Sequence, residues 1–223
     1  HLSLRRQRQM CIRDSYYGAM KAGATVVNFN PLYAEKELEH QINDSQCDVM
    51  VTVNVKQVQS KVEKMLGTTH LKKIISCDLA DALPNMKGFA FRALNTVKGW
   101  FGKSDTMKVT RDATHLSFAK MIERPGKPKP VEISSDDIAV LQYTGGTTGV
   151  PKGAALSHGN LSANLNQANL WFSGGKTSKE QEKMLAVLPF FHVFSMTVQL
   201  NMSLHIGAEL VMMPKFELKE TLK

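Results

Sequence analysis

The sequence predicts an α/β fold that is built from parallel βαβ units. Between residues 16 and 83, short apolar runs typical of buried strands alternate with segments of helical periodicity. The helical segments are long enough to cross over between parallel strands, and such crossovers are right-handed. A hydrophobic content of 43% is ordinary for a globular protein, and no run approaches the roughly 18 apolar residues of a membrane span.

The first half of the chain supplies alternating helices and strands. We expect the last turns of a helix at residues 16–23, helices at 34–44 and 55–66, and strands at 24–28, 47–53 and 70–76. Gly23 is expected to end the first helix, because glycine readily takes the left-handed conformation of a helix terminus. In the second helix, Leu38 and Ile42 lie four residues apart, which predicts that both face the core.

The second half of the chain places a glycine-rich loop between a buried strand and a returning strand. The elements are expected at residues 138–141 for the strand, 143–153 for the loop and 153–157 for the returning arm of the hairpin. A helix at 160–171 follows, with either Ser157 or His158 as its N-cap. Beyond it we expect a strand at 183–188, an uncharged helix at 193–204 and a further strand at 207–213.

The net charge of +8 is concentrated in two stretches of the chain. Residues 1–15 carry four basic and one acidic residue, and residues 84–129 carry ten basic and three acidic residues, so these stretches hold +3 and +7. Residues 16–83 and 130–223 each hold seven basic and eight acidic residues, or −1 apiece. Because the excess is local, it does not predict a nucleic-acid-binding protein.

Residues 84–129 contain a cationic amphipathic helix. Its apolar residues recur at three- and four-residue steps: Met86, Phe89, Ala90, Ala93, Leu94, Val97, Trp100 and Phe101. The basic residues between them are Lys87, Arg92, Lys98 and Lys103. The helix is predicted either to contact an anionic membrane as a peripheral anchor or to pack on the sheet with its basic face in solvent. Prolines between residues 124 and 130 indicate a linker or surface loop after it.

Residues 1–15 lack an initiator methionine and any periodicity. We expect them to be non-native translated sequence or, alternatively, a basic disordered arm. The three cysteines, Cys11, Cys47 and Cys77, show no C-x-x-C spacing, so neither a disulfide framework nor a zinc site is predicted. A reducing cytoplasm is the expected compartment, and no metal-ligating residue is proposed from the sequence.

The loop between Tyr143 and Gly153 has the composition of a phosphate cradle. Glycine lets the backbone approach a ligand closely, threonine hydroxyls donate hydrogen bonds, and Lys152 adds a compact cation. The predicted phosphate-binding residues are Thr144, Gly145, Gly146, Thr147, Thr148, Gly149 and Lys152. The neighbours of Lys152 exclude a Walker A loop, and the glycine spacing excludes a Rossmann fingerprint. The alternative is a glycine- and threonine-rich hairpin with a solvated lysine.

The string at residues 143–153 resembles the phosphate-binding signature of the adenylate-forming superfamily. Residues 141–149, with Gly146 where many relatives carry serine, are similar to bacterial long-chain fatty-acid–CoA ligases, as is the Asn-Pro-Leu-Tyr sequence at 30–33. The resemblance implies that residues 16–223 are part of the large domain of such an enzyme. It implies a reaction in which ATP and a fatty acid give an acyl adenylate and pyrophosphate. Coenzyme A then displaces AMP, and Mg²⁺ offsets triphosphate charge.

One histidine gains a role from this resemblance and not from its spacing. By spacing alone His192, which lies among aromatic residues, is a core residue without a nucleophile or metal partner. The family carries a Pro-x-x-His element here, which implies that His192 lies at the mouth of the acyl pocket near the substrate carboxylate. Phe190, Phe191 and Phe194 line either the entrance of that pocket or the core.

Several elements of the family are not found in residues 1–223. They are the Tyr-Gly-x-Thr-Glu stretch with its magnesium-binding glutamate, the Thr-Gly-Asp stretch that holds the ribose, and the lysine-bearing C-terminal lid. We therefore expect an internal part of the large domain that cannot form acyl adenylate alone. The alternatives are a phosphate- or nucleotide-binding module without catalysis, an enzyme for another carboxylic acid, and a membrane-surface protein built on residues 84–129. Neither acyl chain length nor oligomeric state is predicted.

Overall fold

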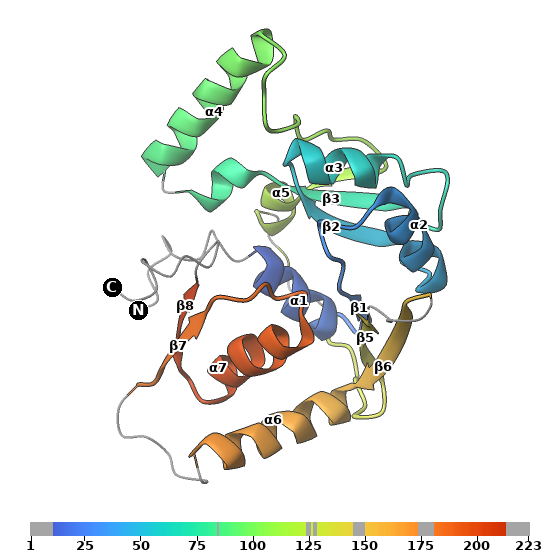
Figure 1. Cartoon of the computed structure of the whole chain (residues 1–223), viewed down its shortest axis with the longest axis vertical. Coiled ribbons are helices and arrows are strands. Elements are labelled where there is room, and N and C mark those ends of the chain that lie inside the picture. The colour runs from blue at the N-terminus through green and yellow to red at the C-terminus, as the bar shows by residue number, and fades with distance from the viewer. Residues whose placement is uncertain are drawn as a thin grey trace. The chain divides into compact units, whose positions relative to one another are not determined.

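The computed structural model describes residues 11–83, 85–123, 126, 129–144, 150–173 and 181–212 (Figure 1). The chain divides into two compact units. The first comprises His1–Gly18 and Phe29–Pro130, and the second comprises Ala19–Asn28 and Val131–Lys223. In the described residues, no helix combines the length and the apolar character that crossing a bilayer requires.

Helix α1 (Cys11–Lys21) begins in the first unit and ends in the second. Gly23 follows it with a φ of +72°, which confirms the predicted glycine terminus. The predicted last turns at 16–23 belong to this helix, and residues 11–15 form its earlier turns. Residues 1–10 lie outside the described residues, and the non-native origin of residues 1–15 stays a prediction.

The first unit contains a parallel sheet with the strand order β2-β3-β4. Its strands are β2 (Val49–Val53), β3 (Lys73–Cys77) and β4 (His115–Ser117). Met50 pairs with Ile74, and Ile75 pairs with Leu116. β2 and β3 confirm two predicted strands, although each begins later than predicted. The sequence did not predict β4, because this short strand has no apolar run to mark it.

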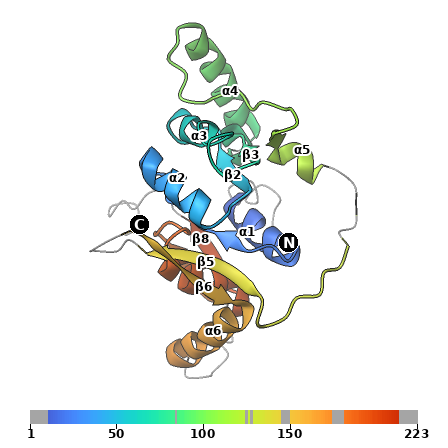
Figure 2. The ribbon, with the colours of Figure 1, turned by 90° about the vertical axis from the view of Figure 1, so that its right-hand side faces the viewer.

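Two helices cover one face of this sheet (Figure 2). They are α2 (Glu35–Asp44) and α3 (Lys56–Glu63). Leu38 and Ile42 of α2 pack with Met50 of β2 and Ile74 of β3, which confirms that both helix residues face the core. α3 ends before the predicted position, and Met65 joins the same core from the turn that follows it. This core arises because the apolar residues of each helix share one face.

The amphipathic segment forms α4 (Asn85–Trp100), as predicted. It follows the short 3-10 helix η2 (Leu79–Ala82), which is its main contact within the unit, and the short helix α5 (Phe118–Ile122) follows β4. In Figure 1, α4 stands away from β2 and β3. Within the first unit, α4 therefore packs on η2 and not on this sheet, and its contact with a membrane stays a prediction. Of the predicted linker at 124–130, residues 124, 125, 127 and 128 lie outside the described residues.

The second unit contains a mixed sheet with the strand order β1-β5-β6. Its strands are β1 (Val26–Val27), β5 (Ile138–Thr144) and β6 (Lys152–Ser157). β1 is parallel to β5, and β5 and β6 form the predicted antiparallel hairpin. A separate parallel pair consists of β7 (Lys183–Ala186) and β8 (Glu209–Met212). The α/β class is confirmed, and β6 is an antiparallel strand in an otherwise parallel pattern.

Helix α6 (His158–Ser173) begins where two side chains cap each other's backbone. The Asn160 backbone N–H donates to Ser157 Oγ at 3.2 Å, and the Ser157 N–H donates to Asn160 Oδ1 at 3.0 Å. This reciprocal arrangement is a capping box with asparagine as the returning side chain. Of the two predicted N-caps, Ser157 is therefore the one that is used.

The predicted uncharged helix at 193–204 is formed mainly by a π-helix, η3 (Ser195–Asn201), which continues into α7 (Met202–His205). Its buried side chains include polar ones. Ser195 Oγ donates to the Leu188 carbonyl at 2.7 Å, and Gln199 Nε2 donates to the Leu185 carbonyl of β7 at 3.2 Å. These bonds attach the helical segment to β7 and to the residues that follow it. π-helical turns are rare and occur frequently at functional sites.

Candidate functional site

The predicted phosphate loop connects the two strands of the β5–β6 hairpin. Thr144, the last residue of β5, pairs with Lys152, the first residue of β6. Both ends of the loop are therefore fixed by the sheet and lie opposite each other. The predicted binding residues Gly145, Gly146, Thr147, Thr148 and Gly149 lie outside the described residues, and their role stays a prediction.

Lys152 is an exposed cation at the foot of this loop. Among the residues that the structure describes, no carboxylate forms an ion pair with it. Val150, before it, is 64% exposed. A lysine that is held in a strand without an internal counter-ion is available to an external anion such as phosphate. The geometry thus fits the predicted cation of a phosphate site.

The glycine after this lysine lies under an aromatic ring. Gly153 pairs with Tyr143 across the hairpin, and Tyr143 is only 7% exposed. A Cβ at Gly153 would lie 2.9 Å from Tyr143 Cε2, which is closer than carbon atoms pack. Gly153 therefore lets the ring lie across β6 next to the foot of the loop.

A buried glutamine links β5 to the segment that carries His192. Gln142 is 8% exposed, and its Nε2 lies 3.4 Å from the carbonyl oxygen of Phe191. Its Oε1 accepts a hydrogen bond from Asn28 Nδ2 at 3.2 Å, just after β1. Through Gln142, the strand that ends at Thr144 is held against the residue next to His192. The predicted phosphate and substrate elements are thus attached to the same strand.

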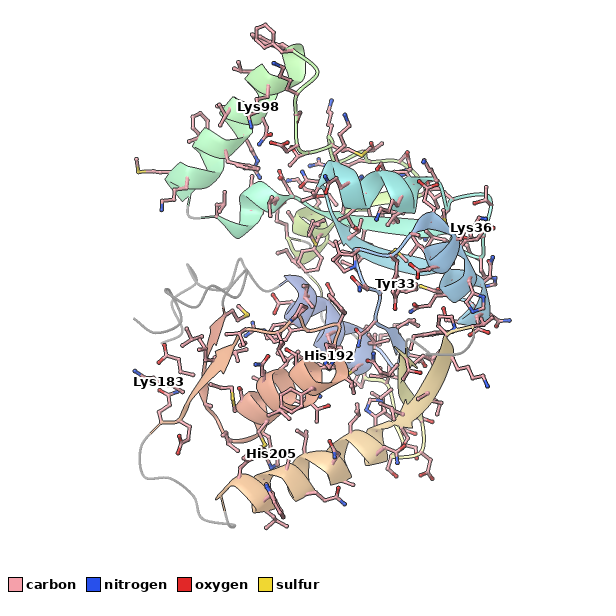
Figure 3. The ribbon with its side chains drawn as sticks, in the orientation of Figure 1. Tyr33, Lys36, Lys98, Lys183, His192 and His205 are labelled. Atoms are coloured by element: carbon pink, nitrogen blue, oxygen red, sulfur yellow. The ribbon has the colours of Figure 1, made fainter. Side chains whose placement is uncertain are left out.

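His192 is exposed and lies at the start of the helical segment that leads into η3 (Figure 3). Its N–H donates to the Pro189 carbonyl at 3.0 Å, and its carbonyl accepts from the Met196 N–H at 3.0 Å. The Phe194 N–H donates to His192 Nδ1 at 3.3 Å. Because Nδ1 accepts, Nε2 carries the proton of the neutral ring and can donate to an external oxygen atom.

Comparisons with known proteins agree with this geometry. A family model described as "AMP-binding enzyme" matches residues 7–223. This chain belongs to the AMP-binding enzyme family. It is similar to a long-chain-fatty-acid–CoA ligase of Bacillus subtilis (38% identity over 209 residues, covering 94% of this chain and 36% of the relative). It is also similar to 4-coumarate-CoA ligase 1 of Narcissus pseudonarcissus (28% identity over 210 residues, covering 92% of this chain and 31% of the relative).

A solved structure of the anthranilate CoA ligase AuaEII in complex with anthranoyl-AMP has a similar fold. The TM-score is 0.68 at 21% identity, and the match covers 93% of this chain and 34% of that one. This AMP-binding enzyme chain thus spans about a third of the length of the relatives that it matches. The fold of the family is confirmed for it.

The predicted aromatic residues of this AMP-binding enzyme differ in their burial. Phe190 and Phe191 are half-buried, whereas Phe194 is 50% exposed. The Phe194 ring is therefore not a core side chain within the described part of the chain. Whether these rings line an acyl pocket stays a prediction.

Sequence reasoning missed the residues that hold this site together. Asn28, Gln142 and Ser195 are polar residues within apolar stretches, and each makes a hydrogen bond that fixes the site. A polar residue inside a predicted buried strand or helix was the available signal, because buried polar groups need partners. The described residues contain no cluster of three or more histidine, cysteine or acidic residues that could hold a metal ion.

Proposed function

We propose that this chain is part of an ATP-dependent ligase that activates a long-chain fatty acid to an acyl adenylate and then to acyl-CoA. The observation that carries the proposal is the attachment of two elements to one strand. β5 ends at Thr144, opposite Lys152, and its Gln142 contacts the residue before His192. This attachment supports a combination of a polyphosphate site with a hydrogen-bond donor for a carboxylate.

In the proposed first step, a carboxylate oxygen of the fatty acid attacks the α-phosphorus of ATP, and pyrophosphate leaves. Thr144, the glycines and threonines of 145–149 and Lys152 would bind the β- and γ-phosphates and stabilise the negative charge of the leaving pyrophosphate. Lys152 suits this role because no described carboxylate neutralises it. The phosphate loop needs no protein nucleophile, since it works by positioning and by charge.

His192 would act on the other substrate. Its Nε2–H can donate to an oxygen of the fatty acid, because Nδ1 already accepts from the Phe194 N–H. In the proposed second step, coenzyme A releases its thiol proton to solvent, the sulfur bonds to the acyl carbon, and AMP leaves with the electrons of the broken acyl–oxygen bond. Magnesium would offset triphosphate charge, but the described residues offer it no cluster of ligands, so no step is assigned to it.

The choice of a long-chain acid rests on the relative with 38% identity, whose name specifies that substrate. A second candidate is an aromatic carboxylic acid, because a 4-coumarate-CoA ligase matches 92% of the chain at 28% identity. Since this chain spans about a third of such relatives, we also propose that residues 1–223 alone form no acyl adenylate. We further propose a cytoplasmic protein with peripheral contact to the inner membrane through residues 84–129.

Substrate-dependent exchange of pyrophosphate into ATP tests this proposal. The gene product at its natural length is incubated with ATP and pyrophosphate, and with palmitate, 4-coumarate or no acid. We expect exchange with palmitate well above the other two mixtures. Exchange with 4-coumarate alone would favour the aromatic acid, and phosphate binding without exchange would favour a non-catalytic module.

A further inference from the structure

The apolar stripe of α4 faces outward. Met86 is 87% exposed, Phe89 75%, Trp100 81% and Phe101 74%, and Leu94 and Val97 are also exposed. Five of these residues lie on α4 and Phe101 directly follows it. Together the six, the α4 stripe, extend along the whole helix, which has 16 residues and is therefore about 24 Å long. Exposed apolar surfaces of this kind mark sites of interaction.

The opposite face of α4 is the one that packs within the first unit, and it is small or polar. A Cβ at Gly88 would lie 2.6 Å from the Ala80 carbonyl oxygen, so the helix approaches η2 as closely as glycine allows. Asn95 is 8% exposed. Arg92 forms ion pairs with Asp78 and Asp81 at the same contact. These contacts fix the rotation of the helix about its axis and keep the stripe pointing away.

This orientation is the reverse of the usual one. A helix of a water-soluble domain normally turns its apolar face to the core and its polar face to solvent. In α4 the small and polar face packs against the unit, and the apolar face is exposed. The rotation of α4 is therefore explained if something outside this unit covers the stripe.

The charges beside the stripe indicate what covers it. Lys87 on α4 and Lys103 just after it are exposed, and neither forms an ion pair with another described residue. The two cations that are paired, Arg92 and Lys98, lie toward the unit. A second copy of this chain would bring like charges together on α4, which opposes self-association through this face. An anionic surface has the complementary charge.

We propose that α4 is a docking helix that lies in the headgroup region of an anionic phospholipid bilayer, with the α4 stripe toward the acyl chains. Tryptophan and phenylalanine suit this depth, and the flanking lysines can reach lipid phosphates. The inference rests on the proposed peripheral membrane contact and gives it an element, an orientation and a lipid charge. It does not depend on adenylation.

Vesicle co-sedimentation tests the apolar part of this proposal without ATP or fatty acid. The 223-residue chain is mixed with vesicles of phosphatidylcholine alone or with added phosphatidylglycerol. The variant Phe89→Glu/Trp100→Glu should lose binding to the anionic vesicles by about tenfold or more. The control, Trp171→Glu/Phe172→Glu on α6, changes the same residue types and charge at positions that are 86% and 66% exposed, and it should bind normally.

The charge part is tested with Lys87→Gln/Lys103→Gln, against Lys36→Gln/Lys183→Gln as the control at exposed lysines elsewhere. About fivefold weaker binding is expected for each lost lysine near the lipid, or roughly 30-fold for the pair. Equal binding to neutral and anionic vesicles, or equal losses in test and control variants, would overturn the proposal. Loss of a dimer with the stripe variant, and no effect on vesicle binding, would instead assign the surface to a second copy. Circular dichroism confirms that each variant is folded.

Discussion

At the scale of single residues, protonation matters most at His115, which contacts two carboxylates. Its Nε2 lies 2.7 Å from Glu63 Oε2 on α3, and its Nδ1 lies 2.9 Å from Asp112 Oδ1. Burial lowers the pKa of His115, but the hydrogen bonds and charges of Glu63 and Asp112 outweigh this and raise it overall. The pKa of Asp112 is lowered, chiefly by its hydrogen bond to His115. The charged ring thus joins α3 to β4.

We predict that this link weakens as the pH rises. The folded pKa of His115 lies above the unfolded value of about 6.5, so its contribution to stability is complete below about pH 6.5 and is lost as the pH rises through the folded pKa. Thermal unfolding followed by circular dichroism from about pH 6 to about pH 9 should show this loss. His115→Gln should flatten the profile, whereas His70→Gln, at an exposed histidine, should not. An unchanged profile in His115→Gln would contradict the prediction.

Two glycines should respond oppositely to alanine. Gly153→Ala places a methyl group 2.9 Å from the buried Tyr143 ring, and we expect it to destabilise the fold by about 1–2 kcal/mol. Gly18→Ala, inside α1 with nothing within 4 Å of the new Cβ, should stabilise it by about 0.5–1 kcal/mol. Urea unfolding measures both free energies. The explanation fails if Gly153→Ala is as stable as Gly18→Ala.

At the scale of elements, periodicity predicted α2 and its buried Leu38 and Ile42, because a helix with a single apolar stripe buries that stripe by packing it on the sheet. The same reasoning placed α4 at the right residues but could not give its rotation. That rotation depends on Gly88 approaching η2 and on Arg92 reaching Asp78 and Asp81, which are tertiary contacts. An amphipathic pattern shows that a helix has an apolar and a polar face. It does not show which of the two packs against the rest of the unit.

The link between β5 and the His192 segment is also an element-scale contact. Gln142→Leu keeps a similar volume but removes the hydrogen bonds to Asn28 and to the Phe191 carbonyl, so we expect a loss of about 1–3 kcal/mol in stability. In the gene product at its natural length it should also raise the KM for the fatty acid. Gln181→Leu, at an exposed residue of the same unit, is the control and should change stability by less than about 0.5 kcal/mol. Equal effects would show that Gln142 has no special role.

At the scale of the whole molecule, the sequence predicted the α/β class and the hairpin that holds the loop. It did not predict that Val26 pairs with Val140, because the local pattern marks a strand at 24–28 but not its partner far away in the chain. For the candidate site, Thr144, Lys152 and His192 were predicted from their motifs. Asn28 and Gln142 were not, since their roles arise when β1, β5 and the His192 segment meet in the fold.

The central claim is that the hairpin loop binds the pyrophosphate part of ATP in an acid-activating enzyme. Palmitate-dependent exchange of pyrophosphate into ATP by Lys152→Met, in the gene product at its natural length, tests it most directly. We expect kcat/KM for exchange to fall by about 100-fold, while Lys183→Met, at an exposed lysine of β7, retains normal exchange. Normal exchange in Lys152→Met would contradict the account.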